Sequence, residues 1–322
     1  MNRRQFLKLC LTAAGVAGAG TLIGRFWHRR CRVWIHSMDD YRRDISRDVA
    51  QVMELEGLFL KGKKVLIKPN FVECHPGRPI NTDPSLIAQV ADACFRLGAA
   101  SVTVGEAPGH RRDPWYSIYH SSLRAVLPTQ VRCIDLNHGD IVKIPNRGWY
   151  TKLKNFYVAA PLAEADLVIS MPKMKTHHTM GVTLSMKNLF GNLPGIVYGW
   201  PKNILHIQGI DRSIVDLALT MPPNFVVVDG IIGMEGDGPI MGTSKKMGVL
   251  VMGKDPLAVD STAARMMGFD PGCIPYMSRA VIHLPGMLDE MNDYPAEHPR
   301  KFASQFQCLE AFRPWQRNGF WG

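Results

Sequence analysis

From Cys31 onward, short apolar runs rich in β-branched residues alternate with stretches whose apolar residues recur at helical spacing. The first run is Val33 to His36, and the first helical stripe lies between Ile45 and Leu55. This alternation predicts an α/β fold in which a mostly parallel sheet has helices on both faces. One large unit with insertions and two closely packed lobes both fit 322 residues. Further strands are predicted at 64–68, 101–105, 131–136, 166–171, 224–229 and 248–253.

Aspartates mark the predicted helix starts. Asp83 precedes Pro84 and Asp255 precedes Pro256, the order expected of a capping residue followed by proline in the first turn. Asp211 is predicted to cap a helix that runs to Leu219. On the helix that follows Asp255, Asp260 is predicted either to face a ligand-binding cleft or to pair with Arg265 on the same helix. Residues 137–161, rich in glycine, proline and aromatic residues, are predicted to leave the sheet.

Polar side chains are densest between Met171 and Gly195, directly after the apolar run at 166–171. Pro172 ends that run, which predicts a cationic loop at the carboxyl end of a strand, where open α/β sheets bind ligands. Lys187 and Asn188 follow on a predicted helix, after a turn that Gly181 permits. Neighbouring lysines repel one another unless an anion lies among them, so the stretch predicts a site for an anion. An ordinary solvated face is the alternative.

Other predicted strand ends supply polar groups that would meet this loop at one edge of a parallel sheet. The candidates for proton transfer are His177, Glu235 and Glu106. The candidates for binding the anion or a cofactor are Lys68, Asn70, Lys173, Lys175, Lys187, Asn188, Asp229 and Asp237. The glycines between 230 and 238 predict a close backbone approach to a ligand. His177 with Glu235 or Glu106 would handle either protons or a metal ion, and the metal is left open. Calcium is not implied, because the acids between 229 and 237 do not have the spacing of a calcium loop.

Four motifs make the chain recognisable: PKMKTH, MKNLFG, VDGIIGMEGDGP at 228–239 and DPLAVDSTAARMMGFD at 255–270. In this order they resemble the domain of unknown function 362 family, over roughly residues 63 to 280. The resemblance assigns no reaction. Many family members carry a ferredoxin-like iron–sulfur segment, and this sequence departs from that pattern.

Cysteine spacing and charge exclude two classes of function. The seven cysteines include no CxxC pair and no short cluster, so we expect no iron–sulfur cluster bound by this chain's own cysteines. The net charge is +10, but residues 1–32 hold seven Lys and Arg and no acid. The remaining 31 basic and 28 acidic residues leave only +3, which argues against nucleic acid as a partner.

The N-terminus resembles an export signal. Arg3 and Arg4 lie in the sequence NRRQFLK, and an apolar segment follows from Leu9 to Ile23. This pattern predicts the twin-arginine export machinery as a partner and a location in the periplasm or at the outer face of the cytoplasmic membrane. Cleavage of the signal and its retention as a single anchor are both compatible with the sequence.

The chain is therefore divided into a signal or anchor at 1–30, an α/β domain at 31–284 and a C-terminal tail at 285–322. The tail is rich in proline and aromatic residues and packs either on the body or on a partner. Two functions are considered. The first is an exported protein that binds an anionic small molecule or cofactor, with or without catalysis. The second is a non-catalytic accessory subunit of a membrane-bound redox complex, docked through the aromatic tail.

Overall fold

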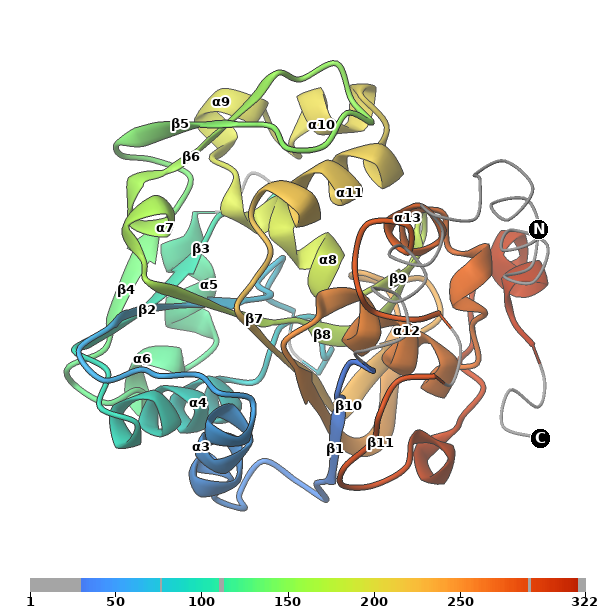
Figure 1. Ribbon diagram of the computed structural model, residues 1–322, viewed down its shortest axis with the longest axis horizontal. Coiled ribbons are helices and arrows are strands. Elements are labelled where there is room, and N and C mark those ends of the chain that lie inside the picture. Colours follow the sequence, from blue (N-terminus) through green and yellow to red (C-terminus); the bar gives the residue numbers. More distant parts are fainter. Residues whose placement is uncertain (1–29, 76, 110–112, 289–290, 318–322) are drawn as a thin grey trace, which may run out of the picture.

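The computed structural model describes residues 30–75, 77–109, 113–288 and 291–317. At its centre is a nine-stranded sheet in the order β1-β11-β10-β7-β2-β3-β4, with β8 beside β10 and β9 beside β8 (Figure 1). The predicted signal falls on residues outside the described ranges. The strands of the sheet are β1 (Trp34–Ser37), β2 (Lys64–Pro69), β3 (Ser101–Glu106), β4 (Arg132–Asp135), β7 (Leu167–Met171), β8 (Lys173–His177), β9 (Gly181–Thr183), β10 (Phe225–Glu235) and β11 (Thr243–Gly253).

The sheet is mostly parallel, which confirms the predicted fold class. Strand β2 pairs in parallel with both β3 and β7, β3 with β4, and β10 with both β7 and β8. Antiparallel pairing is confined to β1 with β11, β10 with β11, and β8 with β9 among the strands of this sheet. The carboxyl ends of β2, β3 and β7 therefore open at one edge of the sheet.

Helices cover both faces, because alternate residues of the buried strands enter two separate cores. Val65 and Ile67 of β2 pack with α3, α4, α5 and α6, whereas Leu66 packs with α8, α11, α12 and α13. Figure 1 shows α3, α4 and α6 below the sheet and the second group above it and to its right. The helices of the first face are α3 (Ser46–Leu55), α4 (Pro84–Arg96), α5 (Pro114–His120) and α6 (Leu123–Val126).

The second face is built from more and shorter helices. They are α7 (Ala160–Glu164), α8 (Ser185–Asn188), η1 (Leu189–Asn192), α9 (Gly195–Tyr198), α10 (Asn203–Ile207), α11 (Ile210–Thr220), α12 (Pro256–Met266) and α13 (Pro275–Ala280), with the 3₁₀ turn η2 (Pro271–Cys273) between α12 and α13. Asp83 caps α4 as predicted, because its carboxylate accepts a hydrogen bond of 2.8 Å from the backbone N–H of Ser85.

Three local predictions need correction. The cationic segment after Pro172 is a buried strand, β8, rather than a loop, because Pro172 interrupts the chain only briefly and β10 pairs with both β7 and β8. Asp211 does not cap α11: Gly209 precedes the helix, and Asp211 forms an ion pair of 2.8 Å with Arg279. Asp260 neither faces a cleft nor pairs with Arg265. Instead its carboxylate accepts hydrogen bonds from the backbone of α8.

Residues 137–161 leave the main sheet, as the sequence predicts. They form a separate hairpin of β5 (Ile141–Pro145) and β6 (Asn155–Ala159). The tail up to residue 317 packs on the body through two 3₁₀ turns, η3 (Pro299–Phe302) and η4 (Glu310–Trp315). Phe306 and Phe312 are buried in the core of the second face, and Gln316 forms a β-bridge with Phe269. Within the described ranges, we find no helix long and apolar enough to cross a membrane.

Candidate functional site

The first buried polar centre lies on the sheet face that α8 covers. Lys68 at the end of β2 forms an ion pair of 2.7 Å with Glu106 at the end of β3. The ammonium also lies 3.3 Å from Oδ1 of Asn188 on α8. Asn70 donates to the same oxygen over 3.2 Å, and Asn188 in turn donates to Ser170 Oγ. The structure thus brings four predicted site residues together, from strand ends and a helix far apart in the chain.

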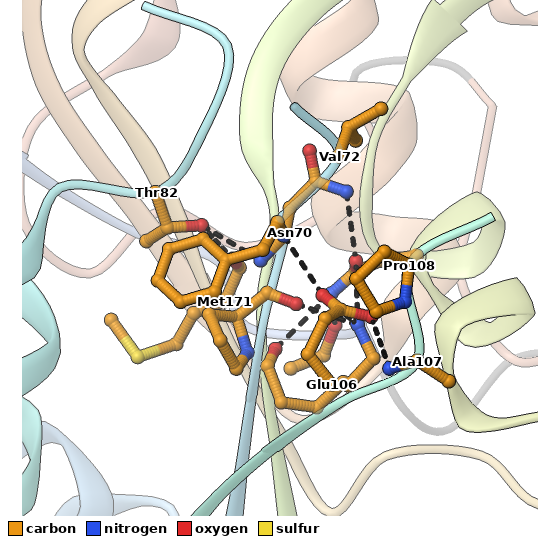
Figure 2. A network of polar contacts seen from close by, with 12 residues as sticks. Asn70, Val72, Thr82, Glu106, Ala107, Pro108 and Met171 are labelled. Carbon is orange, nitrogen blue, oxygen red and sulfur yellow. Dashed lines mark hydrogen bonds and ion pairs between the residues drawn. The ribbon is translucent and has the colours of Figure 1, made fainter. Parts of the chain in front are cut away.

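Glu106 and Asn70 also organise the backbone around this centre (Figure 2). The Glu106 carboxylate accepts hydrogen bonds from the backbone N–H groups of Phe71 and Ala107. The N–H of Asn70 donates to Thr82 Oγ1, whose hydroxyl donates to the carbonyl of Met171 over 2.6 Å. Burial raises the pKa of Glu106 and lowers that of Lys68, and the attraction between the two charges opposes both shifts. Three donors on one carboxylate favour its ionised form, so Lys68 and Glu106 neutralise each other.

The second buried polar centre lies on the opposite face, towards α3 and α4. Lys173 forms an ion pair of 2.8 Å with Asp229, and its ammonium also donates to the hydroxyl of Tyr41. Tyr41 and the backbone N–H of Asp83 donate to the two oxygens of Asp229. A cavity of about 600 Å³ lies over this centre, with Tyr41, Asp83 and Lys173 among its lining residues.

Lys175, His177 and Lys187 form a third group, which we call the cationic cluster. Lys175 is fully buried, and its ammonium donates to the backbone carbonyl of Ile80 over 2.7 Å. Burial and the neighbouring charges of Lys187 and Lys173 hold the pKa of Lys175 well below its usual range. Burial alone lowers the pKa of Lys187 to about 8. Among the residues that the structure describes, no carboxylate lies within ion-pair distance of either ammonium.

His177 is positioned to donate a hydrogen bond rather than to accept a proton. Burial, followed by the charges of Lys187, His178 and Lys175, holds the pKa of His177 well below its usual range, so the ring is neutral near pH 7. Its Nδ1 accepts a hydrogen bond of 3.1 Å from the backbone N–H of Thr179. The ring hydrogen is therefore assigned to Nε2. The neighbouring His178 lies in the turn after β8 and is exposed.

Glu235 and Asp237 lie at and just beyond the end of β10, next to the part of that strand that pairs with β8. Glu235 forms an ion pair of 3.0 Å with Lys245 and accepts a hydrogen bond from the N–H of Gln307 in the tail. Asp237 is exposed. The glycine-rich turn serves protein packing rather than ligand approach, because a Cβ atom on Gly238 would overlap the carbonyl of Thr176. Glu235 is thus held by Lys245 and the tail, and the expectation that these two acids join the lysines in one cleft stays a prediction.

Sequence reasoning missed several polar residues that belong to this region. Tyr41 and Thr82 form hydrogen bonds in the two buried polar centres, although both lie outside the predicted polar stretch. Lys202 is buried beside Asn137, with 2.7 Å between its ammonium and Oδ1, and burial lowers its pKa to about 7. Asn192 is also buried, and neither amide atom of its side chain has a hydrogen-bond partner among the described residues. The signal for both was their position in a stretch from 167 to 210 that contains no acid.

Asp260 explains how α8 is held in place. Its carboxylate on α12 accepts hydrogen bonds from the backbone N–H groups of Ser185 and Met186 and from the Ser185 hydroxyl, at 2.6–2.9 Å. These bonds satisfy backbone N–H groups in the first turn of α8, the helix that carries Lys187 and Asn188. Burial raises the pKa of Asp260 to about 7. Asp260 therefore positions two site residues without belonging to the cationic cluster.

No group of three or more histidine, cysteine, aspartate or glutamate residues suited to hold a metal ion occurs within the described part of the chain. The six cysteines there are free thiols, and Cys94 and Cys133 are buried as expected from their apolar neighbours.

The chain is similar in sequence to one protein family and to one relative within the set compared, and more distantly similar to one solved structure. The model of the family described as Domain of unknown function (DUF362) matches residues 65–265. A thylakoid-associated protein from Synechocystis sp. is 30% identical over 254 residues, which is 76% of each chain. The lactate racemase apoprotein from Thermoanaerobacterium thermosaccharolyticum is 15% identical with a TM-score of 0.42. That match covers 68% of this chain and about half, 54%, of the racemase chain.

Proposed function

Because the chain belongs to the family called Domain of unknown function (DUF362), whose name assigns no activity, we propose a function from its own side chains. The protein binds an anionic small molecule at the cationic cluster of Lys175, His177 and Lys187. The observation that carries this proposal is the fully buried Lys175 beside the partly exposed Lys187, with no carboxylate within ion-pair distance of either ammonium among the described residues. Two other lysines of the site, Lys68 and Lys173, are buried and each has a carboxylate partner, whereas the buried Lys202 lies against Asn137.

An isolated ammonium loses several kcal/mol of hydration when it is buried, and a second positive charge nearby adds to that cost. An anion bound between Lys175 and Lys187 offsets both terms, because it replaces lost hydration and separates the like charges. The Nε2–H of His177 supplies a neutral donor to the same ligand. The arrangement therefore favours an anion that accepts hydrogen bonds in several directions, as sulfate, phosphate and carboxylates do.

The structure gives weaker support for catalysis than for binding. His177 is a donor through Nε2, Glu106 is engaged by Lys68 and two backbone N–H groups, and Glu235 is paired with Lys245. None of the three candidates for proton transfer is therefore poised as a base in this state. We accordingly limit the proposal to recognition of the anion.

Titration with sodium sulfate tests the proposal, because the charge of sulfate is constant across the pH range of interest. Lys187 is protonated below its pKa of about 8 and neutral above it, so sulfate affinity is expected to fall as the pH rises through 8. If only the protonated form binds, the loss between pH 7 and pH 9 is about tenfold. Isothermal titration calorimetry at pH 6.5, 7.5 and 9 measures it. An affinity that stays constant across this range contradicts the assignment of Lys187.

We also propose that the chain is exported through the twin-arginine route and works on the outer side of the cytoplasmic membrane. The support is the sequence around Arg3 and Arg4, and the description of the Synechocystis relative as thylakoid-associated is compatible with a membrane location. Replacing Arg3 and Arg4 by lysine is expected to leave the protein folded in the cytoplasm, because lysine lacks the planar, bidentate donor array of a guanidinium. Cell fractionation with immunoblotting measures the outcome, and full export of the double variant contradicts it.

The alternative of a redox-complex subunit docked through the aromatic tail has less support. Phe306 and Phe312 are buried in the body, and a Cβ atom on Gly181 would touch the ring of Trp315. The described tail aromatics thus pack largely within the chain itself. The last tail aromatics, Phe320 and Trp321, lie outside the described residues.

A further inference from the structure

Large apolar side chains are exposed where the β5–β6 hairpin, α9 and α10 form one end of the molecule (Figure 1). Ile207 on α10 is 81% exposed, and Ile204 on the same short helix is exposed as well. A spacing of three residues places these two side chains on the same side of α10. Ile196 on α9 is also exposed.

The hairpin adds a second amphipathic element. Its register pairs Lys143 with Tyr157, so these two residues project from the same face as Ile141, and all three are exposed. The opposite face carries Phe156 and Val158, which are buried in the core. The outer face of the hairpin is therefore a mixture of apolar, aromatic and basic side chains.

Two hydrogen bonds fix the hairpin to the helical segment. The backbone N–H of Tyr157 donates to the hydroxyl of Tyr198 at the end of α9 over 2.8 Å. The N–H of Lys152 in the hairpin loop donates to Oε1 of Gln208 just after α10 over 2.9 Å. We call the joined surface of Ile141, Lys143, Tyr157, Ile196, Ile204 and Ile207 the apical face.

The exposed charge of the hairpin is mostly basic, although Asp140 just before β5 is exposed and the Asp216 carboxylate accepts hydrogen bonds from the backbone of the hairpin loop. Residues 141–210 contain eight Lys and Arg, of which Lys173, Lys175, Lys187 and Lys202 belong to the interior site, and two acids, Glu164 and Asp166. Asp166 lies 3.6 Å from Lys63, outside this stretch, and is neutralised there. In the hairpin and its loop, four basic residues are exposed and no acid occurs between 141 and 163. They are Lys143, Arg147, Lys152 and Lys154.

We propose that the apical face docks on an anionic lipid surface. Ile204 and Ile207 enter the boundary between headgroups and acyl chains, while the exposed lysines of the hairpin contact lipid phosphates. Protruding aliphatic side chains beside tyrosine and several basic residues are typical of interfacial membrane binding. The exposed basic residues of the hairpin are attracted by the negative charge of an anionic bilayer. A neutral protein partner would not attract them, so the charge favours lipid.

Hydrogen exchange of the full-length protein tests the docking directly and separates it from any binding through the N-terminus. Vesicles of phosphatidylcholine with 30% phosphatidylglycerol (about one lipid in three, enough to attract several basic residues) are expected to slow amide exchange in peptides covering 196–208. Vesicles of phosphatidylcholine alone are expected to have a much smaller effect. Unchanged exchange in 196–208 with the anionic vesicles overturns the proposal. Slowing by polyglutamate but not by vesicles overturns it too and assigns the face to an acidic protein.

Matched variants locate the contact. Ile204→Ser with Ile207→Ser, and separately Lys152→Glu with Lys154→Glu, are expected to abolish the slowing of exchange by anionic vesicles. Phe59→Ser is the control for the first pair, because Phe59 is 85% exposed at a distant position in the chain. Lys61→Glu with Lys246→Glu is the control for the second pair, since both lysines are exposed and the net charge is the same. Equal loss in a control and its matched variant overturns the assignment of this face.

Discussion

Replacing Lys187 by methionine is expected to weaken sulfate binding by roughly 10- to 100-fold, because a hydrogen bond to a charged group contributes about 1.5–3 kcal/mol. Lys175→Met is expected to have a similar effect, since its ammonium belongs to the same cluster. Methionine retains most of the length and apolar volume of lysine, so each change removes mainly the charge. Calorimetric titration at pH 7 measures the loss for each variant.

The stability of the same variants distinguishes a binding site from a structural one. Burial holds the pKa of Lys175 well below its usual range, which means that its charged form costs free energy in the folded state. Lys175→Met is therefore expected to leave the melting temperature unchanged or to raise it while sulfate binding is lost. Lys246→Met, at an exposed position on β11, is the matched control and should change neither property. A strongly destabilised Lys175→Met protein would show that this lysine serves the fold, not a ligand.

Glu106→Ala is expected to lower the free energy of unfolding by about 3–5 kcal/mol, because it leaves Lys68 buried without a partner. It also removes the acceptor for the backbone N–H groups of Phe71 and Ala107. Urea denaturation measures the change. Glu235→Ala is the control, since Glu235 pairs with a partly exposed lysine and the expected loss there is smaller, about 1 kcal/mol.

A second pair of variants isolates the charge in this effect. Glu106→Gln keeps a side-chain acceptor but removes the negative charge, so it is expected to retain much of the destabilisation. Adding Lys68→Met should recover most of the lost stability, because no unpaired charge then remains buried. If the double variant is as unstable as Glu106→Gln alone, the pair does not act as a mutual neutralisation and the first buried polar centre has another basis.

Most of the strands and the capped start of α4 were predictable because their signals are local. Asp83 followed by Pro84 specifies a helix start whatever surrounds it. The apolar runs of β2, β7 and β10 specify buried strands for the same reason. Strand β8 was missed because Pro172 and the four polar residues of KMKTH imitate the end of a strand, and pairing with β10 and β9 keeps that segment extended.

The assembly of the site depended on information that no local pattern contains. A continuous apolar run shows that a strand is buried on both sides but not which residue faces which side. Lys68 consequently meets Asn188 on one face of the sheet, whereas Lys173 meets Tyr41 on the other. In the same way, no local pattern shows that Glu235 accepts a hydrogen bond from the C-terminal tail.

The sequence by itself determined the α/β class, the family and the chemical character of the site, because periodicity, ordered motifs and a stretch without acids are properties of the chain. Only the tertiary structure decided which lysines are neutralised. Lys68 and Lys173 acquire carboxylates from strands distant in sequence, while Lys175 and Lys187 acquire none among the described residues. The physical reason is that neutralisation of a buried charge depends on the few ångströms around it, and those neighbours are chosen by the packing of the sheet and not by the order of residues.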